Sequence, residues 1–195
     1  MTIRRAAIVA PMRTPVGTFG GSLRAVPVEE LAATAIKAVL EQTGIDPGLV
    51  DDVSFAQSYV NGETPCIGRW AALHAGLPVS VPGLQIDRRC GGGLQAVVTA
   101  AMMVQTGAAD VVLAGGAESM SRGLYGLPAQ RWGARMGNVD TDDLMVGALT
   151  DPFDEKDARR VEFGPARSTC VREPPSRLRT DTRPHEPEGD TRCDS

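Results

Sequence analysis

The sequence is poor in several residue types that mark particular functions. Only two of its 195 residues are lysine, Lys37 and Lys156, and only two are histidine, so arginine carries nearly all the positive charge. The formal net charge of -4 argues against a general nucleic-acid-binding protein. A continuous apolar run of about 18 residues, which a transmembrane helix needs, is also missing. Hydrophobic residues make up 42% of the chain, which is close to globular usage.

The four cysteines, Cys66, Cys90, Cys170 and Cys193, include no C-x-x-C pair of the kind that binds a metal. The apolar run near the N-terminus is too short for a signal-peptide core. We therefore expect a cytoplasmic protein with free thiols, no metal, and no nucleic-acid or membrane partner.

Residues 1–117 alternate between strand-like and helix-like patterns. Glycines at positions 44, 76 and 107 follow the expected helices where a C-cap glycine belongs. The alternation predicts an α/β fold with βαβ units and a largely parallel sheet. Strands are expected at 6–10, 52–59, 81–87 and 109–114, and helices at 28–43, 65–75 and 92–106.

The remaining residues have a different character. Residues 118–153 do not continue the alternation of strands and helices and are rich in glycine, methionine and arginine. This composition indicates a partly ordered segment outside the α/β core. Residues 154–195 carry many charges and prolines without hydrophobic periodicity. Such a segment cannot bury a core, so we expect it to be disordered.

Cys90 is the main candidate for a reactive residue. It lies between the strand expected at 81–87 and the helix expected at 92–106, and three glycines follow it. A thiol at this junction faces the free N–H groups and positive dipole end of the helix, which favour the thiolate and could hold an oxyanion. Arg88 and Arg89 would add to this effect if they point toward the sulfur. The alternative is a buried, inert cysteine.

The helix at 92–106 leaves almost no polar face. A helix that is apolar all round is buried on all sides, so one small sheet cannot cover it. Its apolar residues are Leu94, Ala96, Val97, Val98, Ala100, Ala101, Met102, Met103 and Val104.

Several ordered motifs resemble those of the thiolase family. They are Arg13-Thr-Pro15, the A-A-L-H-A-G-L-P run at 71–78, the C-G-G-G-L-Q-A-V run at 90–97, the A-G-G-A-E-S-M-S run at 114–121, and segments at 131–137 and 149–153. The resemblance covers residues 1–153. It implies that 1–117 form the N-terminal α/β half, with a mixed, mostly parallel sheet and helices on both faces. Residues 118–153 would begin the loop domain, and 154–195 would be an unrelated tail.

The resemblance implies an acyltransferase of fatty acid metabolism. Such enzymes move acyl groups between a cysteine thioester and coenzyme A, forming or cleaving 3-ketoacyl-CoA with no metal or permanently bound cofactor. Cys90 matches the nucleophile that takes the acyl group. Acyl-CoA thioesters would be the substrates, and the family's dimers and tetramers imply a homo-oligomer or self-association.

The sequence departs from the family pattern at several points. Position 92 is glycine where the family usually has serine, and Asp87 replaces a common asparagine. In the family, a histidine in a Gly-His-Pro motif activates the nucleophile, and a second cysteine in a C-terminal Cys-x-Gly motif is the acid/base. The histidine has no counterpart here, since the two histidines are His74 and His185. Cys66-Ile-Gly has the Cys-x-Gly pattern but precedes the nucleophile, so a structural role is the simpler interpretation.

These departures leave three interpretations open. The leading one is a truncated thiolase-type acyltransferase with impaired activity. The second is a non-catalytic module that packs against a partner chain. The third is a condensing enzyme of the ketoacyl-synthase type, which the Arg13-Thr-Pro15 and Glu118-Ser-Met-Ser121 motifs disfavour.

Overall fold

In the computed structural model, residues 3–149 are described. They all belong to one structural unit, Met1–Val161, while the second unit, Glu162–Ser195, lies outside the described residues. The expectation of a disordered tail at 154–195 therefore also falls outside them, together with the cysteines and the histidine of that tail.

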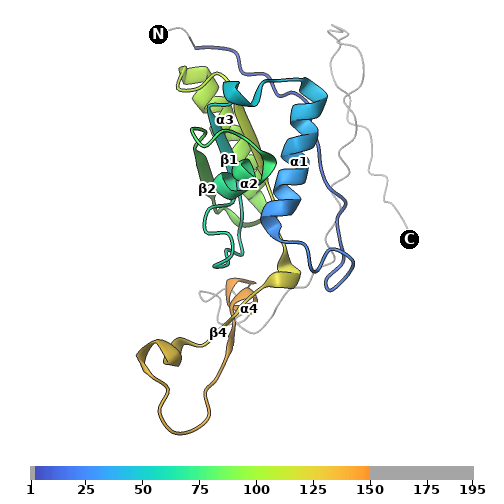
Figure 1. The fold of residues 1–195 in the computed structure, drawn as a ribbon. Helices are drawn as coiled ribbons and strands as arrows, with labels where there is room; N and C mark the ends of the chain where they lie inside the picture. Colours follow the sequence, from blue (N-terminus) through green and yellow to red (C-terminus); the bar gives the residue numbers. More distant parts are fainter. Residues whose placement is uncertain (1–2, 150–195) are drawn as a thin grey trace, which may run out of the picture. The chain divides into compact units, whose positions relative to one another are not determined.

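Three short parallel strands form the central sheet (Figure 1). Strand β1 (Asp52–Ala56) is in the middle, with β2 (Gly83–Ile86) on one side and β3 (Val112–Gly116) on the other. Both neighbours pair with β1 in parallel, so all three strands end at the same edge of the sheet. This confirms the predicted α/β character and the mostly parallel sheet.

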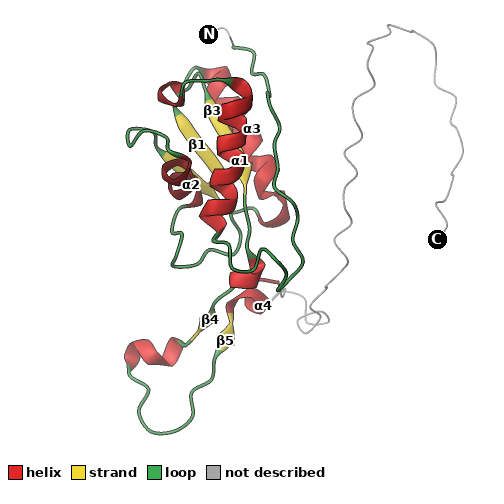
Figure 2. Ribbon diagram, turned by 45° about the vertical axis from the view of Figure 1, so that its right-hand side comes forward, coloured by secondary structure: helices red, strands yellow, loops and turns green. Residues whose placement is uncertain are grey.

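The helices cover both faces of this sheet (Figure 2). Helix α2 (Ile67–Ala75) connects β1 to β2, and α3 (Gly92–Thr106) connects β2 to β3 in the opposite direction across the sheet. Because both crossovers are right-handed, opposite directions place the two helices on opposite faces. Helix α1 (Val28–Thr43) packs against α2 on its face.

The alternation of side chains along β1 divides the core between these two faces. Val53 and Phe55 are buried in the cluster that α1 and α2 form. Ser54 and Ala56 point to the other face, where Gly92 of α3 lies against Ala56. A period of two along a strand produces this division. The small residues of β1 thus let α3 approach closely.

The three helices end where the glycines predict. Gly44, Gly76 and Gly107 each follow a helix in the left-handed conformation, with φ values of 65°, 88° and 76°. Each of these glycines donates its backbone N–H to a carbonyl in the last turn of its helix, which satisfies one of the unpaired acceptors there.

One expected strand is wrong. Residues 6–10 form no strand, and the side chains of Ile8 and Val9 are 77% and 64% exposed. The nearby backbone contact is a single bond, from the Arg4 N–H to the Gln105 carbonyl at 3.1 Å. A β-branched run forms a strand only when it lies along a free sheet edge, and this segment runs along none.

Other strands have different ends from those expected. The strand expected at 52–59 stops at Ala56, and the one expected at 109–114 runs from Val112 to Gly116. Gly115 and Gly116 extend β3 because they pair with Phe55 and Ala56 of β1. A Cβ on Gly115 would lie 3.0 Å from the Phe55 ring, so glycine fits this strand.

The segment after β3 contains short elements. A 3-10 turn at Met120–Arg122 precedes β4 (Tyr125–Gly126), which pairs antiparallel with β5 (Asp142–Asp143). Helix α4 (Leu144–Leu149) follows β5 directly. A further 3-10 turn lies at Pro128–Trp132. Within residues 3–149, no helix is long and apolar enough to cross a membrane.

Candidate active site

Cys90 lies at the edge of the sheet where the parallel strands end. Strand β2 ends at Ile86, a 3-10 turn spans Arg89–Gly91, and α3 begins at Gly92. The strand-to-helix junction is therefore where the sequence predicts it. The thiol is free and exposed, so the alternative of a buried cysteine is wrong. The crevice beyond the carboxyl ends of parallel strands is the usual ligand site of open α/β sheets.

Asp87 fixes the turn that carries Cys90. Arg89 has a φ of 48°, a left-handed conformation that a non-glycine residue adopts at a cost. The Asp87 carboxylate holds it by accepting from the Arg89 N–H at 3.0 Å and from the Arg89 Nη1 at 3.0 Å. The aspartate that departs from the family pattern thus supports the conformation beside the cysteine.

The two arginines before Cys90 have partners of their own. Arg89 Nη1 also donates to the Ser58 carbonyl at 3.0 Å, and Arg88 Nη1 donates to Gln95 Oε1 on α3. The sequence allowed both guanidinium groups to point at the sulfur. Instead, the Arg89 side chain joins the cysteine turn to the loop that follows β1.

Glu118 holds the same loop from the end of β3. Its Oε2 accepts from the Ser58 N–H at 2.7 Å, and the Tyr59 N–H lies 3.3 Å from both carboxylate oxygens. Burial raises the pKa of the Glu118 carboxyl, while the two backbone N–H donors oppose that rise. Residues from the ends of all three strands therefore meet around this loop.

Tyr59 lies on the loop that Glu118 and Arg89 hold. Burial raises the pKa of the Tyr59 phenol, and the negative charges of Glu118 and Cys90 raise it further. Tyr59 is half-buried. At neutral pH the phenol therefore remains a hydrogen-bond donor.

A cleft of about 240 Å³ opens beside the cysteine turn. Most of its lining comes from the loop after β1 and from the segment of β4 and α4, and Arg89 contributes from the turn itself. Polar and apolar groups contribute to its walls in similar measure, so a ligand could be held by both kinds of contact. The lining residues are Ser58, Tyr59, Val60, Asn61, Arg89, Gly123, Leu124, Leu144 and Met145.

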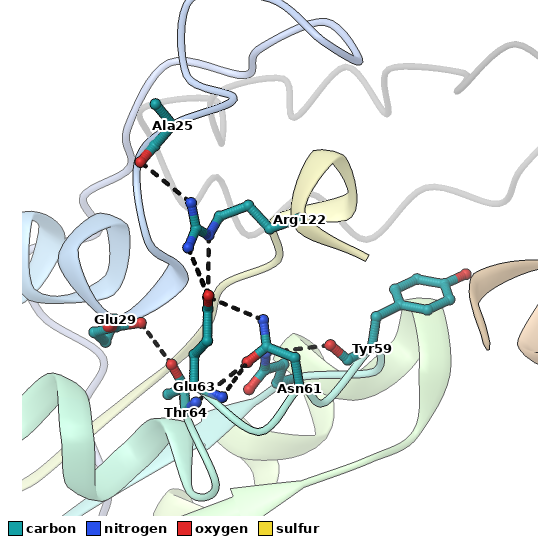
Figure 3. A network of polar contacts seen from close by, with 8 residues as sticks. Ala25, Glu29, Tyr59, Asn61, Glu63, Thr64 and Arg122 are labelled. Carbon is teal, nitrogen blue, oxygen red and sulfur yellow. Dashed lines mark hydrogen bonds and ion pairs between the residues drawn. The ribbon is translucent and has the colours of Figure 1, made fainter. Parts of the chain in front are cut away.

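A second polar network anchors the far end of the same loop (Figure 3). Asn61 Oδ1 accepts from the N–H groups of Glu63 and Thr64, and the Thr64 hydroxyl donates to the buried Glu29 carboxylate at 2.5 Å. Arg122 donates from Nε and Nη2 to Glu63, at 3.1 and 2.8 Å. One wall of the cleft is therefore held at both ends.

The other residues singled out in the sequence lie away from this site. Cys66 is the N-cap residue of α2, and its thiol donates to the Gly83 carbonyl at 3.4 Å. His74 lies exposed in the last turn of α2, with its ring centroid 6.0 Å from that of Trp70. Neither residue belongs to the cleft lining, which supports their structural interpretation.

Two site residues were not singled out from the sequence. Glu118 lay inside a quoted motif without an assigned role, and Tyr59 was placed inside a strand that ends three residues earlier. Their signal is positional, since both follow the carboxyl ends of parallel strands. Among residues 3–149, no group of three or more His, Cys, Asp or Glu side chains could hold a metal ion.

Comparison with known proteins places this geometry in a family. Residues 6–159 match the family model described as thiolase, N-terminal domain, which extends beyond the expected limit at 153. The beta-ketothiolase BktB of Cupriavidus necator is 40% identical over 171 residues, covering 87% of this chain and 42% of that protein. An acetyl-CoA acetyltransferase of Chromobacterium violaceum is 47% identical over 148 residues, covering 75% of this chain and 38% of that protein.

A solved structure agrees with these matches. The crystal structure of the Bacillus anthracis acetyl-CoA acetyltransferase superposes with a TM-score of 0.74 at 38% sequence identity, covering 78% of this chain and 39% of that one. The chain thus spans about two fifths of the length of these relatives. With a family model matching most of its length and a shared fold, the chain belongs to the thiolase family.

Proposed function

We propose that this chain accepts an acyl group from a coenzyme A thioester on Cys90, as the first half of thiolase-type acyl transfer. The observation that carries the proposal is the exposed Cys90 thiol on a fixed turn at the start of α3. Cys90 lies in the turn that directly precedes α3, so the positive end of the helix dipole would stabilise the oxyanion that forms when a thioester carbonyl is attacked, while the N–H groups of Gly91 and Gly92 already donate to Arg88 and Arg89.

The substrate class follows from the relatives. They carry the names acetyl-CoA acetyltransferase and beta-ketothiolase, so acetyl-CoA and 3-ketoacyl-CoA are the proposed substrates. The chemistry needs neither a metal nor a permanently bound cofactor, because a thiolate attacks a thioester directly and expels another thiolate. We place this reaction in fatty acid metabolism in the cytoplasm.

Turnover of the chain on its own is proposed to be impaired. Deacylation and condensation need proton transfer by positioned groups. The family resemblance assigns these roles to a Gly-His-Pro histidine and to a second cysteine in a later Cys-x-Gly motif, and neither motif occurs at a matching place in this sequence. We therefore expect acylation of Cys90 to outpace the later steps.

One structural observation favours a second role, in association. Leu94, Val98 and Met102 of α3 are 72%, 44% and 57% exposed and recur every four residues, so they form one stripe, here called the α3 stripe. Only Gly92, Ala96 and Ala100 of this helix are fully buried. We propose that a second copy of the chain covers the α3 stripe.

The thiolase match favours this family over a ketoacyl-synthase-type enzyme.

Release of coenzyme A tests the proposal. The purified chain is mixed with acetyl-CoA, quenched in acid at short times, and assayed for free coenzyme A by chromatography. Release should approach one equivalent per chain, vanish in Cys90→Ala, and persist in the matched control Cys66→Ala. Release that survives in Cys90→Ala, or that disappears in Cys66→Ala, contradicts the assignment of Cys90.

A further inference from the structure

The loop after β1 has its backbone groups committed on both sides of Tyr59. The Gln57 N–H donates to the Ile86 carbonyl at 3.1 Å, which extends the contact between β1 and β2. The N–H groups of Ser58 and Tyr59 donate to Glu118, and the Ser58 carbonyl accepts from Arg89. The backbone at Tyr59 is thus tied to the cysteine turn and to the end of β3.

Among the described residues, two side-chain polar groups of this loop have no hydrogen-bond partner, the buried Gln57 Oε1 and the phenol hydroxyl of Tyr59, and only the hydroxyl can donate. Within the described part of the chain, Tyr59 takes part in hydrogen bonds through its N–H and its carbonyl, and none involves the hydroxyl. The side chain is half-buried in the lining of the cleft. A hydroxyl on the lining of a cleft can give its hydrogen bond to a group that enters the cleft and displaces water.

The charges around Tyr59 favour a hydrogen-bond donor. Burial, Glu118, Cys90 and Asp87 raise the pKa of the phenol, and Arg89 lowers it. The proton therefore stays on the oxygen throughout the neutral range. Arg89, the residue immediately before Cys90, lines the same cleft as Tyr59 and donates to the Ser58 carbonyl beside it.

We propose that Tyr59 is a substrate-binding residue, whose phenol hydroxyl donates a hydrogen bond to an oxygen of the acyl group that Cys90 accepts. This inference rests on the proposed function of Cys90. It adds a side-chain donor from the loop after β1 to the positive dipole end of α3. Leu124, Leu144 and Met145, which line the same cleft, offer apolar contact to the carbon chain of the same group.

The step itself balances without any further reactant. The Cys90 sulfur attacks the thioester carbonyl carbon, and the bond between that carbon and the carrier sulfur breaks. The products are the acyl-Cys90 thioester and the carrier thiol, which receives the proton that Cys90 gave up. A donor on the carbonyl oxygen stabilises the negative charge that this oxygen carries between the two events.

The test compares acylation with alkylation of the same thiol. The probes are the acetyl thioester of N-acetylcysteamine, which needs no nucleotide site, and iodoacetamide, which alkylates without forming an oxyanion. Rates at Cys90 are followed by peptide mass for the unaltered chain and for Tyr59→Phe. Tyr125→Phe is the matched control, because Tyr125 is exposed and outside the cleft lining. Thermal melting of each variant verifies that it is folded.

The proposal expects Tyr59→Phe to slow acetylation about 3- to 10-fold, the loss expected for one hydrogen bond, and to leave alkylation within about two-fold. Tyr125→Phe should change neither rate. Equal acetylation of the unaltered chain and Tyr59→Phe overturns the role of Tyr59 and leaves Cys90 standing. An equal fall in both reactions also overturns it, because Tyr59 would then act on the thiol. Alkylation without any acetylation in the unaltered chain overturns both proposals together.

Discussion

A Cβ atom added at Gly92 would lie 2.8 Å from the Cβ of Ala56. Two carbon atoms do not approach this closely, so the start of α3 and the end of β1 fit together only while one of the two positions is small. Glycine at the position where the family usually has serine therefore has a packing reason in this chain. The two residues bring the cysteine turn against the central strand.

This contact predicts a coupled pair of substitutions. Gly92→Ala should lower the free energy of unfolding by about 1–2 kcal/mol through overpacking. Ala56→Gly should cost about 1 kcal/mol through loss of a methyl group and added backbone freedom. The double variant should be more stable than the sum of both effects implies, by at least about 0.5 kcal/mol. Urea unfolding of the four proteins measures this coupling, and simple additivity would contradict the close contact.

A second prediction ranks the thiols of the described region. Cys90 should react with iodoacetamide at neutral pH faster than Cys66, because Cys90 is exposed at a helix start while Cys66 donates to the Gly83 carbonyl. Peptide mass mapping at several times gives both rates. Cys170 and Cys193 are left out of the ranking because they lie outside the described residues. Faster labelling of Cys66 would refute the assignment.

Much of this site was predictable, and the remainder has physical reasons. The junction that holds Cys90 follows from a strand signal, a helix signal and three glycines in immediate succession. Residues 6–10 were predicted to form a strand from their β-branched residues. A local sequence pattern does not show whether a free sheet edge is available for pairing. The strand was expected to run through Tyr59, but it ends at Ala56, and the Glu118 side chain accepts from the N–H groups of Ser58 and Tyr59. A hydrogen bond between residues about 60 positions apart cannot be predicted from the local sequence pattern.

The α3 stripe predicts association of the isolated chain. Leaving a few hundred Å² of apolar surface exposed forfeits several kcal/mol at about 25 cal/mol per Å². The chain should therefore elute as an oligomer in size-exclusion chromatography with light scattering, or bind the dye ANS. Leu94→Gln with Met102→Gln should reduce both effects. Leu49→Gln is the matched control, since Leu49 is exposed elsewhere. A monomer that melts cooperatively and binds no ANS would contradict the prediction.

Two carboxylates should affect stability with opposite dependence on pH. The pKa of Glu118 is raised above 4.5 by burial, so the native state keeps a proton that the unfolded state has lost. The contribution of Glu118 to the free energy of unfolding is fully present below pH 4.5, the pKa in the unfolded state. It is lost as the pH rises through the higher pKa of the native state. The pKa of Asp51 is lowered below 3.8 by the N–H groups of Val111 and Asp110, so its contribution is present above 3.8 and is lost as the pH falls.

Difference measurements isolate these two contributions. The unaltered chain should lose stability relative to Glu118→Gln as the pH rises from about 4.5, and relative to Asp51→Asn as it falls below about 3.8. Urea unfolding across this range supplies the data. Parallel curves for either variant would show that its carboxyl titrates alike in both states.

Steady turnover should be slow in the chain assayed alone. Loss of positioned acid–base groups commonly costs a factor of about 10²–10⁴ per group. Thiolysis of acetoacetyl-CoA, followed by its disappearance in the presence of coenzyme A, should therefore be far below the rate of Cys90 acylation. Cys90→Ala provides the background. Rapid turnover that depends on Cys90 would show that the later steps need no further groups.

The central claim is that Cys90 takes the acyl group, and intact mass spectrometry after incubation with acetyl-CoA tests it most directly. The predicted result is one added acetyl group per chain, located on the peptide that contains Cys90 and released by hydroxylamine, as a thioester should be. The same treatment of Cys90→Ala should leave the mass unchanged. An unmodified chain, or an acetyl group found on Cys66 or on a lysine, would contradict the account.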